Sequence, residues 1–553
     1  MSGTGESASV WPATTADGRA RAVALREYAA HVSEPAAAVA FRSAGRLLIR
    51  GGGSGALALG RSALAAGLPA CLVVEDDTVA SAAGPQDPEG PGGIERAAGE
   101  VVALEGHLGA FRCRLELAGR DGPAEVEVDL VLDLGAPPLV DLPRPPVGYL
   151  RAGADPEARR AALDALRDLV GEFEKPRYFD YDPDRCAHGR SGIQACRRCL
   201  QTCPTGAITS LGDQVQVDPW LCQGIGSCAT ACPSGAIRYR HPGLADALGR
   251  LRRTLDAWAG AGGSRPAILF HDEAGRQSLE ARAAELPEHM LPLEVEEIGA
   301  VGMDVWLAAL AFGAARVGLW LPPDLPTGVR NELQAQLHVA RALLEGMGYP
   351  AGALSLARAG APGESPPVPA ASAMPALEPA RFACLDGKRE TLRLALDHLH
   401  AHAPARRPLV NLPQGAPWGT ALVDAGRCTL CMACVGQCPG GALQAGQELP
   451  QLRFVEANCL QCGLCCRTCP EDAIAISPRY LFDGEQRRSP RILHEAEPFA
   501  CIGCGKAFAT RAMIERIERQ MGAHPLFQGE ARRRLHMCED CRVRDLMAEG
   551  EIS

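Results

Sequence analysis

The residues of this 553-residue chain that are best suited to metal chemistry are its 23 cysteines, which are spread very unevenly. All of them fall within a few short motifs except Cys71, Cys113, Cys384 and Cys466. A disulfide framework is typical of small secreted domains that cannot build a hydrophobic core, and this chain is too long to need one. The cysteines therefore predict metal ligands.

Two copies of the motif C-x2-C-x2-C-x3-C-P lie in the C-terminal half, one starting at Cys428 and one at Cys459. Three thiolates on one tight loop can bind three irons of a cubic [4Fe-4S] cluster, and the fourth cysteine then binds the other cluster. The predicted sets are Cys428, Cys431, Cys434 and Cys469 for one cluster and Cys459, Cys462, Cys465 and Cys438 for the other. A pair of zinc sites is the alternative, and the doubled spacing disfavours it.

Over residues 420–480 this pattern resembles the bacterial-type ferredoxins that hold two clusters. The resemblance implies a compact (βαβ)2 fold with two [4Fe-4S] clusters close enough for electron hopping. Cys466 lies inside the second motif but off its spacing, and we expect it to be a packed spare thiol.

An earlier pair of copies, within residues 181–240, is a degenerate version of the same module. Its first copy has Ile193 where the first cysteine is expected, and Cys186 is the nearest substitute. His188 is a competing ligand, although a solvated histidine in the loop is the preferred interpretation. The predicted four-iron set is Cys186, Cys196, Cys199 and Cys232.

The second copy of the degenerate pair has Ile225 at the second cysteine position, and an aliphatic side chain cannot bind iron. Its pattern, C-x2-I-x2-C-x3-C-P, resembles the three-cysteine motif of iron–sulfur subunits that hold a [3Fe-4S] cluster. That resemblance implies a fourth cluster on Cys203, Cys222 and Cys228, one ligand short of the others.

Two C-x2-C knuckles close the chain, Cys501/Cys504 and Cys538/Cys541, with 33 residues and a predicted helix over 510–521 between them. Four thiolates from two knuckles suit tetrahedral zinc in a closed structural site. A redox-active C-x2-C pair and a single rubredoxin-like iron are the alternatives. We expect a zinc-knuckle tail over residues 495–545.

A glycine loop near the N-terminus follows a predicted strand at 46–50. Gly51, Gly53 and Ala56 match G-x-G-x-x-[G/A], and Glu75 lies where a ribose-binding acid would stand. Glycine is abundant, with 61 residues, and the rest of a doubly wound domain looks short and irregular. A vestigial Rossmann-like βαβ unit that only packs is therefore preferred to a nucleotide site. The later segment EGHLGAFRCRLEL…VEVDLVLDLG also resembles a fragment of flavin-linked disulfide oxidoreductases.

The elements that must position these motifs indicate an α+β multidomain protein: two ferredoxin-like modules with α/β domains around them and a small zinc tail. A cysteine-free region of alternating strands and helices separates the modules and predicts a small parallel α/β layer. The expected parts are an α/β N-terminal domain over 1–135, a linker and helix over 136–180, the degenerate module over 181–240, the α/β domain over 241–358, a linker over 359–380, a connecting segment over 381–419, the complete module over 420–480 and the tail over 495–545.

Charge and hydropathy narrow the classes of function. A net charge of −10 argues against sequence-independent nucleic-acid binding, which relies on Lys and Arg. A membrane span needs about 20 apolar residues, and the longest apolar run is far shorter; a signal peptide is also not expected. These features predict a cytoplasmic protein.

The layout as a whole resembles large cytoplasmic polyferredoxins that accompany formate dehydrogenase systems. The motif order and the CIGCGKAFATR…MCEDC segment carry this resemblance. It implies a carrier that relays single electrons to or from a redox partner, rather than a self-contained enzyme. The alternatives are a flavin- or NAD(P)-linked oxidoreductase subunit that uses the glycine loop, and an assembly or regulatory factor that docks through the zinc tail.

Overall fold

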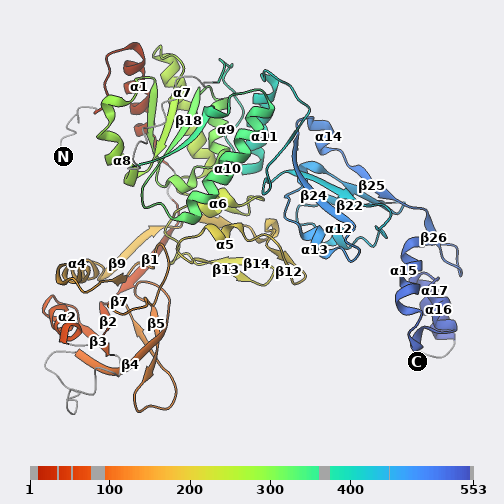
Figure 1. Cartoon of the computed structure of the whole chain (residues 1–553), viewed down its shortest axis with the longest axis horizontal. Helices are drawn as coiled ribbons and strands as arrows, with labels where there is room; N and C mark the ends of the chain where they lie inside the picture. The colour runs from red at the N-terminus through yellow and green to blue at the C-terminus, as the bar shows by residue number, and fades with distance from the viewer. Residues whose placement is uncertain are drawn as a thin grey trace.

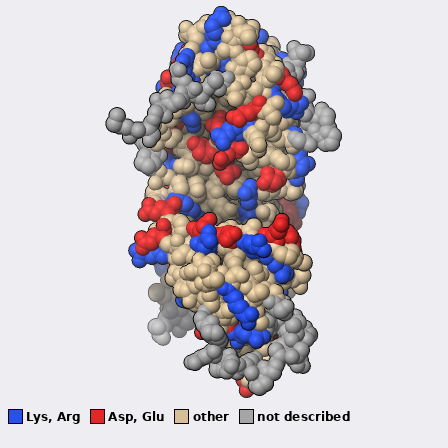
Figure 2. All heavy atoms as spheres, turned by 90° about the vertical axis from the view of Figure 1, so that its left-hand side faces the viewer, with Lys and Arg blue, Asp and Glu red and all other residues tan. Residues whose placement is uncertain are grey.

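The fold is that of a computed structural model, and the residues it describes are 10–33, 36–51, 54–75, 94–359, 374–447 and 449–548. Along the chain it places an N-terminal α/β domain, the degenerate module, an α/β insert, the complete module and a small tail (Figure 1). On the face that Figure 2 shows, acidic and basic side chains are interspersed.

The N-terminal domain is built on a seven-stranded sheet in the order β6-β5-β4-β3-β2-β7-β8. The strands are β2 (Arg46–Arg50), β3 (Ala70–Glu75), β4 (Ile94–Glu105), β5 (Phe111–Leu117), β6 (Ala124–Val128), β7 (Leu130–Asp133) and β8 (Tyr149–Arg151). β4, β3, β2, β7 and β8 run parallel, whereas β4, β5 and β6 form an antiparallel meander. Helices α2 (Ser54–Ala65) and α4 (Pro156–Arg167) pack on one face. The sheet is thus larger than the short, irregular remainder that the sequence suggested.

The boundaries of this domain differ from the predicted 1–135. β8 and α4 lie beyond the proline-rich segment and belong to the domain, because Leu163 and Leu166 of α4 complete its core. Helix α1 (Ala16–Ala30) instead packs on the insert, where Ala20, Ala24 and Tyr28 join the insert core. Strand β1 (Ala38–Ser43), which follows α1, pairs antiparallel with β9 (Gly171–Pro176), which follows α4.

The insert holds a parallel sheet in the order β17-β16-β18-β19. Its strands are β16 (Ala267–His271), β17 (Met290–Glu294), β18 (Arg316–Leu321) and β19 (Leu354–Arg358), and its helices are α7 (Leu244–Gly260), α8 (Glu273–Glu280), α9 (Met303–Ala311) and α10 (Thr327–Gly346). Every residue of α9 is buried, and all of them except Asp304 are apolar, as expected for a helix enclosed on all sides. The region between the modules thus contains a parallel α/β layer.

Residues 381–419, predicted to be a connecting segment, contain a core helix. Helix α11 (Lys388–Ala401) packs against α9 and buries Leu392, Leu396 and Leu399. Strand β20 (Leu409–Asn411) then pairs with the complete module. The prediction is wrong because α11 packs on the insert across a low-complexity stretch that interrupts the alternation of the sequence. Most of that stretch, 360–373, lies outside the described residues.

Each ferredoxin-type module has two short helices between antiparallel strand pairs. The degenerate module comprises β10 (Phe179–Tyr181), β11 (Gly189–Arg190), β12 (Ile193–Gln194), α5 (Arg198–Thr202), β13 (Ile208–Leu211), β14 (Gln214–Val217), α6 (Ser227–Ala231) and β15 (Ile237–Tyr239). The complete module comprises β21 (Gly419–Val423), α12 (Ala433–Gln437), β22 (Leu443–Ala445), β23 (Gln451–Phe454), α13 (Leu464–Thr468) and β24 (Ile474–Leu481). In both, the outer strands pair, as do the two central ones, in keeping with the expected (βαβ)2 pattern.

The tail begins after α14 (Gly484–Arg488) and β25 (Arg491–Glu495). A hairpin of β26 (Pro498–Ala500) and β27 (Ala507–Thr510) carries the first knuckle, and α15 (Arg511–Met521), α16 (Glu530–Arg534) and α17 (Glu539–Ala548) follow. Thr510 caps α15 through a hydrogen bond from the Met513 amide. The same Thr510 hydroxyl donates to Thr429 O at 3.0 Å, so the tail contacts the complete module.

We predict that Leu396→Ala destabilises the insert by about 2–5 kcal/mol, because it opens a cavity in a fully buried site. Urea unfolding followed by the fluorescence of the buried Trp258, Trp306 and Trp320 measures the loss. Leu385→Ala, in the same segment but 38% exposed, is the control and should change stability by under about 0.5 kcal/mol. Equally small effects of both changes would show that residues 381–419 only connect domains.

Candidate metal centres

One cavity of the complete module is lined by four cysteines. They are Cys428, Cys431, Cys434 and Cys469. The rest of its wall is largely apolar and includes Val423, Leu452 and Ile474. Leu430 and Met432, between the three clustered cysteines, have positive φ angles of 56° and 59°, which wrap the loop around the cavity.

A second cavity is lined by the other four motif cysteines of the module. They are Cys438, Cys459, Cys462 and Cys465. Its loop repeats the left-handed positions at Gln461 and Gly463, with φ angles of 54° and 81°. Each cavity thus takes three cysteines from one copy and its fourth from the other.

Backbone amides reach the sulfurs of the fourth cysteines in a symmetric way. The Ala442 amide donates to Cys438 Sγ at 3.2 Å, and the Ala473 amide donates to Cys469 Sγ at 3.3 Å. Such hydrogen bonds favour the thiolate. Burial acts in the opposite direction and raises the pKa of the Cys434 and Cys462 thiols to about 12. A bound metal reverses this balance, because thiolate ligands are deprotonated on binding.

The donor set of both cavities fits a cubic iron–sulfur cluster, because four sulfurs line a wall that is otherwise largely apolar. In each cavity the four cysteine sulfurs are spread around the wall. A single metal ion would instead need four sulfurs that lie close to one another. Cys466, which the spacing left out, has its Sγ 4.0 Å from Cys465 Sγ.

The degenerate module gathers its cysteines in the same manner. Six of them pack into its small core with Phe179 and Ile237: Cys186, Cys199, Cys203, Cys222, Cys228 and Cys232. Burial raises the pKa of the Cys196 thiol, and the neighbouring Cys232 and Cys186 raise it further. The structure therefore brings Cys186, the substitute ligand, to the predicted set despite its distance in sequence.

The remaining predicted set of this module also comes together. Burial raises the pKa of the Cys228 thiol well above its usual range, and the next contributions come from Cys222 and Cys203. Cys203 Sγ lies 3.3 Å from the Thr205 hydroxyl.

Ile225, at the missing cysteine position, is 7% exposed and belongs to the hydrophobic core of the insert. It lies against Gly299 in the turn Ile298–Ala300, where a Cβ added to the glycine would stand 2.5 Å from Ile225 O. The position therefore serves to dock the module on the insert.

His188, the competing ligand, is buried with both ring nitrogens engaged. Nδ1 lies 2.7 Å from Cys196 O and Nε2 lies 2.7 Å from the Ser210 hydroxyl. The ring braces the loop between Cys186 and Cys196, and the histidine is not the solvated residue that a loop position suggests.

The four tail cysteines form a tight quartet. The sulfurs of Cys501, Cys504, Cys538 and Cys541 all lie within 4.8 Å of one another. Tetrahedral zinc with Zn–S bonds of about 2.3 Å requires sulfurs about 3.8 Å apart, so the quartet has the right size. The amides of Gly503 and Cys538 donate to Cys501 Sγ at 3.3 and 3.2 Å, which supports a thiolate there.

The glycine loop follows β2, which lies between β3 and β7 at the point where the strand order reverses. In open α/β sheets this is where nucleotides bind. Here the carboxyl ends of β2 and β7 are joined by an Arg50–Asp133 ion pair of 3.2 Å, and Arg50 also donates to Pro137 O at 2.7 Å. Gly51 has φ +148° and Ala56 is buried. Gly53 and the side chain of Glu75 lie outside the described residues.

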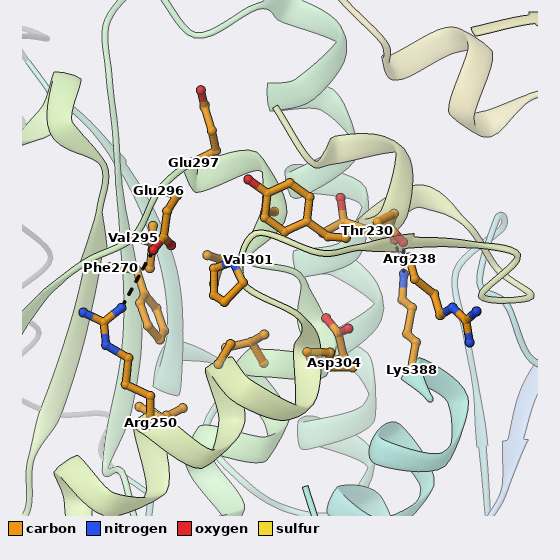
Figure 3. A pocket seen from close by; sticks show the side chains of 18 of the residues that line it. Thr230, Arg238, Arg250, Phe270, Val295, Glu296, Glu297, Val301, Asp304 and Lys388 are labelled. Carbon is orange, nitrogen blue, oxygen red and sulfur yellow. Dashed lines mark hydrogen bonds and ion pairs between the residues drawn. The ribbon is translucent and has the colours of Figure 1, made fainter. Parts of the chain in front are cut away.

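A further cavity, of about 90 Å³, lies between the degenerate module and the insert (Figure 3). Phe270 and Val301 contribute apolar wall, and Asp304 and Lys388 lie at its edge (Figure 3). Asp304 is buried, and its Oδ1 has no hydrogen-bond partner within the described part of the chain.

Three of the four cysteines outside the motifs pack in or against hydrophobic cores. Cys71 and Cys113 are buried in its two core clusters, and burial raises the pKa of both thiols to about 12. Cys384 is partly buried against the insert core.

Comparison with known proteins agrees with the cysteine geometry. Residues 194–236 match the family model of the 4Fe-4S dicluster domain, and residues 421–444 match that of the 4Fe-4S binding domain. Over 39 residues the chain is 49% identical to hydrogenase-4 component A of Escherichia coli (strain K12). That segment is 7% of this chain and 19% of the relative, so the likeness covers about a fifth of the relative's length.

Among the described residues, the helices are all too short or too polar to cross a membrane. The two family matches fall on the two modules whose cysteines the fold gathers. The chain thus contains two 4Fe-4S ferredoxin-type domains, and these domains together with the hydrogenase component match support iron–sulfur electron transfer.

Proposed function

We propose that the protein relays single electrons through four iron–sulfur clusters to or from a redox enzyme. The observation that carries the proposal is the crossed lining of two adjacent cavities by eight cysteines, repeated with altered ligands in a second module. An iron–sulfur cluster supplies one-electron chemistry, and the protein adjusts its potential through burial, charge and hydrogen bonds to sulfur. The proposed complement is three [4Fe-4S] clusters, one [3Fe-4S] cluster and one zinc ion.

The partner in this proposal is an oxidoreductase of the formate dehydrogenase kind. The order of the motifs supports it, and the local identity to a hydrogenase component supports a redox enzyme in general. A cytoplasmic location, where thiols stay reduced, belongs to the proposal.

The N-terminal domain is assigned a packing role. A nucleotide-dependent oxidoreductase subunit is the second candidate, favoured by the place of the glycine loop at the switch point of the sheet. The Arg50–Asp133 pair across that crevice favours packing.

Loss of the Cys469 thiol should remove the cluster of Cys428, Cys431 and Cys434, because the cavities are crossed. In anaerobically purified protein, iron and sulfide should fall by one cluster in Cys469→Ser. The double variant Cys469→Ser/Cys428→Ser should lose no more iron than either single change, whereas Cys469→Ser/Cys459→Ser should lose two clusters.

The crossed ligand sets would be contradicted if Cys469→Ser/Cys428→Ser lost two clusters' worth of iron and Cys469→Ser/Cys459→Ser lost only one. Wild-type protein with intact zinc but without iron and sulfide would overturn the relay itself.

The Ile225 position predicts a [3Fe-4S] cluster on Cys203, Cys222 and Cys228. A three-iron cluster is paramagnetic when oxidised and a [4Fe-4S]2+ cluster is silent, so the oxidised protein should give an EPR signal. Ile225→Cys should abolish that signal and add one iron per chain. Ile225→Val, which perturbs the same buried contact without a thiol, should keep it. Full cubane stoichiometry and a silent oxidised wild type would exclude the assignment.

Zinc in the tail should be structural, because metal binding and local folding are coupled. Cys504→Ser should lose one zinc per chain and make residues 501–548 sensitive to protease, while iron content and cluster spectra stay nearly unchanged. Cys384→Ser, outside every proposed set, is the control. Bleaching of an iron–sulfur band in Cys504→Ser with zinc unchanged would show that the quartet holds iron.

A further inference from the structure

The two modules lie side by side although the insert separates them in sequence. Arg467, at the end of α13, donates to Gln194 O in β12 at 2.6 Å, and Arg190 donates to Cys438 O at 3.5 Å. Figure 1 shows α13 next to β12. The cysteine sets that face each other across this contact are the one containing Cys196 and the one containing Cys462.

The proximity of these two cysteine sets also affects the pKa of one of their thiols. Burial is the main cause that raises the pKa of the Cys462 thiol to about 12, and Cys196 of the other module raises it further. The junction therefore lies between two inner sites, while the sets of Cys428 and of Cys222 lie on the outer sides.

Two consecutive cations at the start of α11 occupy this junction. Lys388 Nζ donates to Ala229 O at 3.1 Å, to Thr230 O and to Cys232 O at 3.4 Å (Figure 3). Three acceptors match the three N–H donors of an ammonium group. Cys232 belongs to the inner set of the degenerate module.

Arg389 reaches the inner set of the other module. Its Nη2 donates to Cys459 O at 3.0 Å and to Ala457 O at 3.2 Å, and its Nη1 donates to Pro233 O at 3.1 Å and to Pro417 O at 3.0 Å. One guanidinium thus spans loops of both modules, and a guanidinium keeps its charge in proteins.

The acceptors of both cations are backbone carbonyls, so these contacts leave the charges without a direct carboxylate partner. The N-terminal end of the 14-residue helix α11 adds partial positive charge of the same sign. Burial lowers the pKa of Lys388, whereas the carboxylate of Asp304, on the insert side of the junction, raises it and so favours the charged ammonium. Positive charge is therefore concentrated between the two inner sites.

We infer that Lys388 and Arg389 form a cationic bridge that raises the reduction potentials of the two inner clusters and couples the modules into one electron path. This inference rests on the proposed relay. A cluster that gains an electron gains one negative charge, so a buried cation nearby favours the reduced form. Lys388 acts on the cluster of Cys232 and Arg389 on the cluster of Cys459.

The test is an anaerobic redox titration followed by EPR on the full-length protein with all clusters in place. Arg389→Met and Lys388→Met should each lower the reduction potential of one inner cluster by at least about 59 mV. For a one-electron couple this shift is a tenfold fall in the ratio of reduced to oxidised cluster at a given solution potential. Arg389→Lys keeps the charge and should stay close to wild type. Arg252→Met is the matched control, since Arg252 also donates to a backbone carbonyl, Phe382 O, within the insert.

Normal iron and sulfide with unchanged potentials in both methionine variants would overturn the inference and leave the relay standing. A fall of equal size in Arg389→Lys and Arg389→Met would also overturn it, because charge would then not be the cause. If the methionine variants lose iron, Arg389→Gln replaces them: a lowered potential supports the bridge and an unchanged one refutes it. Wild-type protein without iron and sulfide would instead refute the relay.

Discussion

The exchange of the fourth cysteine between repeat copies is the constraint on which the rest of each module depends. In the complete module, neither copy can line a cavity with four sulfurs by itself, because Cys438 and Cys469 each lie in the cavity of the other copy. Helices α12 and α13, which end directly before these two cysteines, must therefore pack against each other. The antiparallel strand pairs that join the copies hold this crossing in place.

The insert is the scaffold that holds the modules together. Its turn at Gly299 receives Ile225 of the degenerate module, and α11, buried against α9, presents Lys388 and Arg389 to both modules. This explains why a cysteine-free α/β layer lies between two cysteine-rich units. It also gives a packing reason for Ile225, since an apolar side chain at that site completes the core of the insert.

Short-range spacing made the grouping of the cysteines in the complete module predictable. The crossed sets of the complete module follow from the C-x2-C-x2-C-x3-C-P pattern, and the cavities contain the same residues. The parallel layer around β16 and β18 could be predicted because strands that are buried on both faces have continuous apolar sequences. The tail helix was predicted from Thr510 to Met521, and the structure begins it one residue later because Thr510 is its cap.

What the sequence did not reveal depends on contacts between distant segments. No local signal shows that α1 packs on α7 rather than on the N-terminal sheet, or that β8 joins that sheet across a proline-rich stretch. His188 looked like a loop residue, and only the fold shows both of its nitrogens engaged. Arg389 is not part of any sequence motif. Its role depends on four acceptors that come from three separate segments of the chain, so only the fold reveals it.

The long sequence separation of the module junction has a consequence for the order of assembly. Gln194 and Arg467, which meet there, are 273 residues apart, and Arg198 and Gly415, which also bond, are 217 apart. Contacts of such separation form late, because the chain entropy they cost must first be offset by nearer contacts. During synthesis the degenerate module and the insert emerge before the complete module exists. The contacts that join the two modules can therefore form only after the chain has been made through α13 and has closed on the insert.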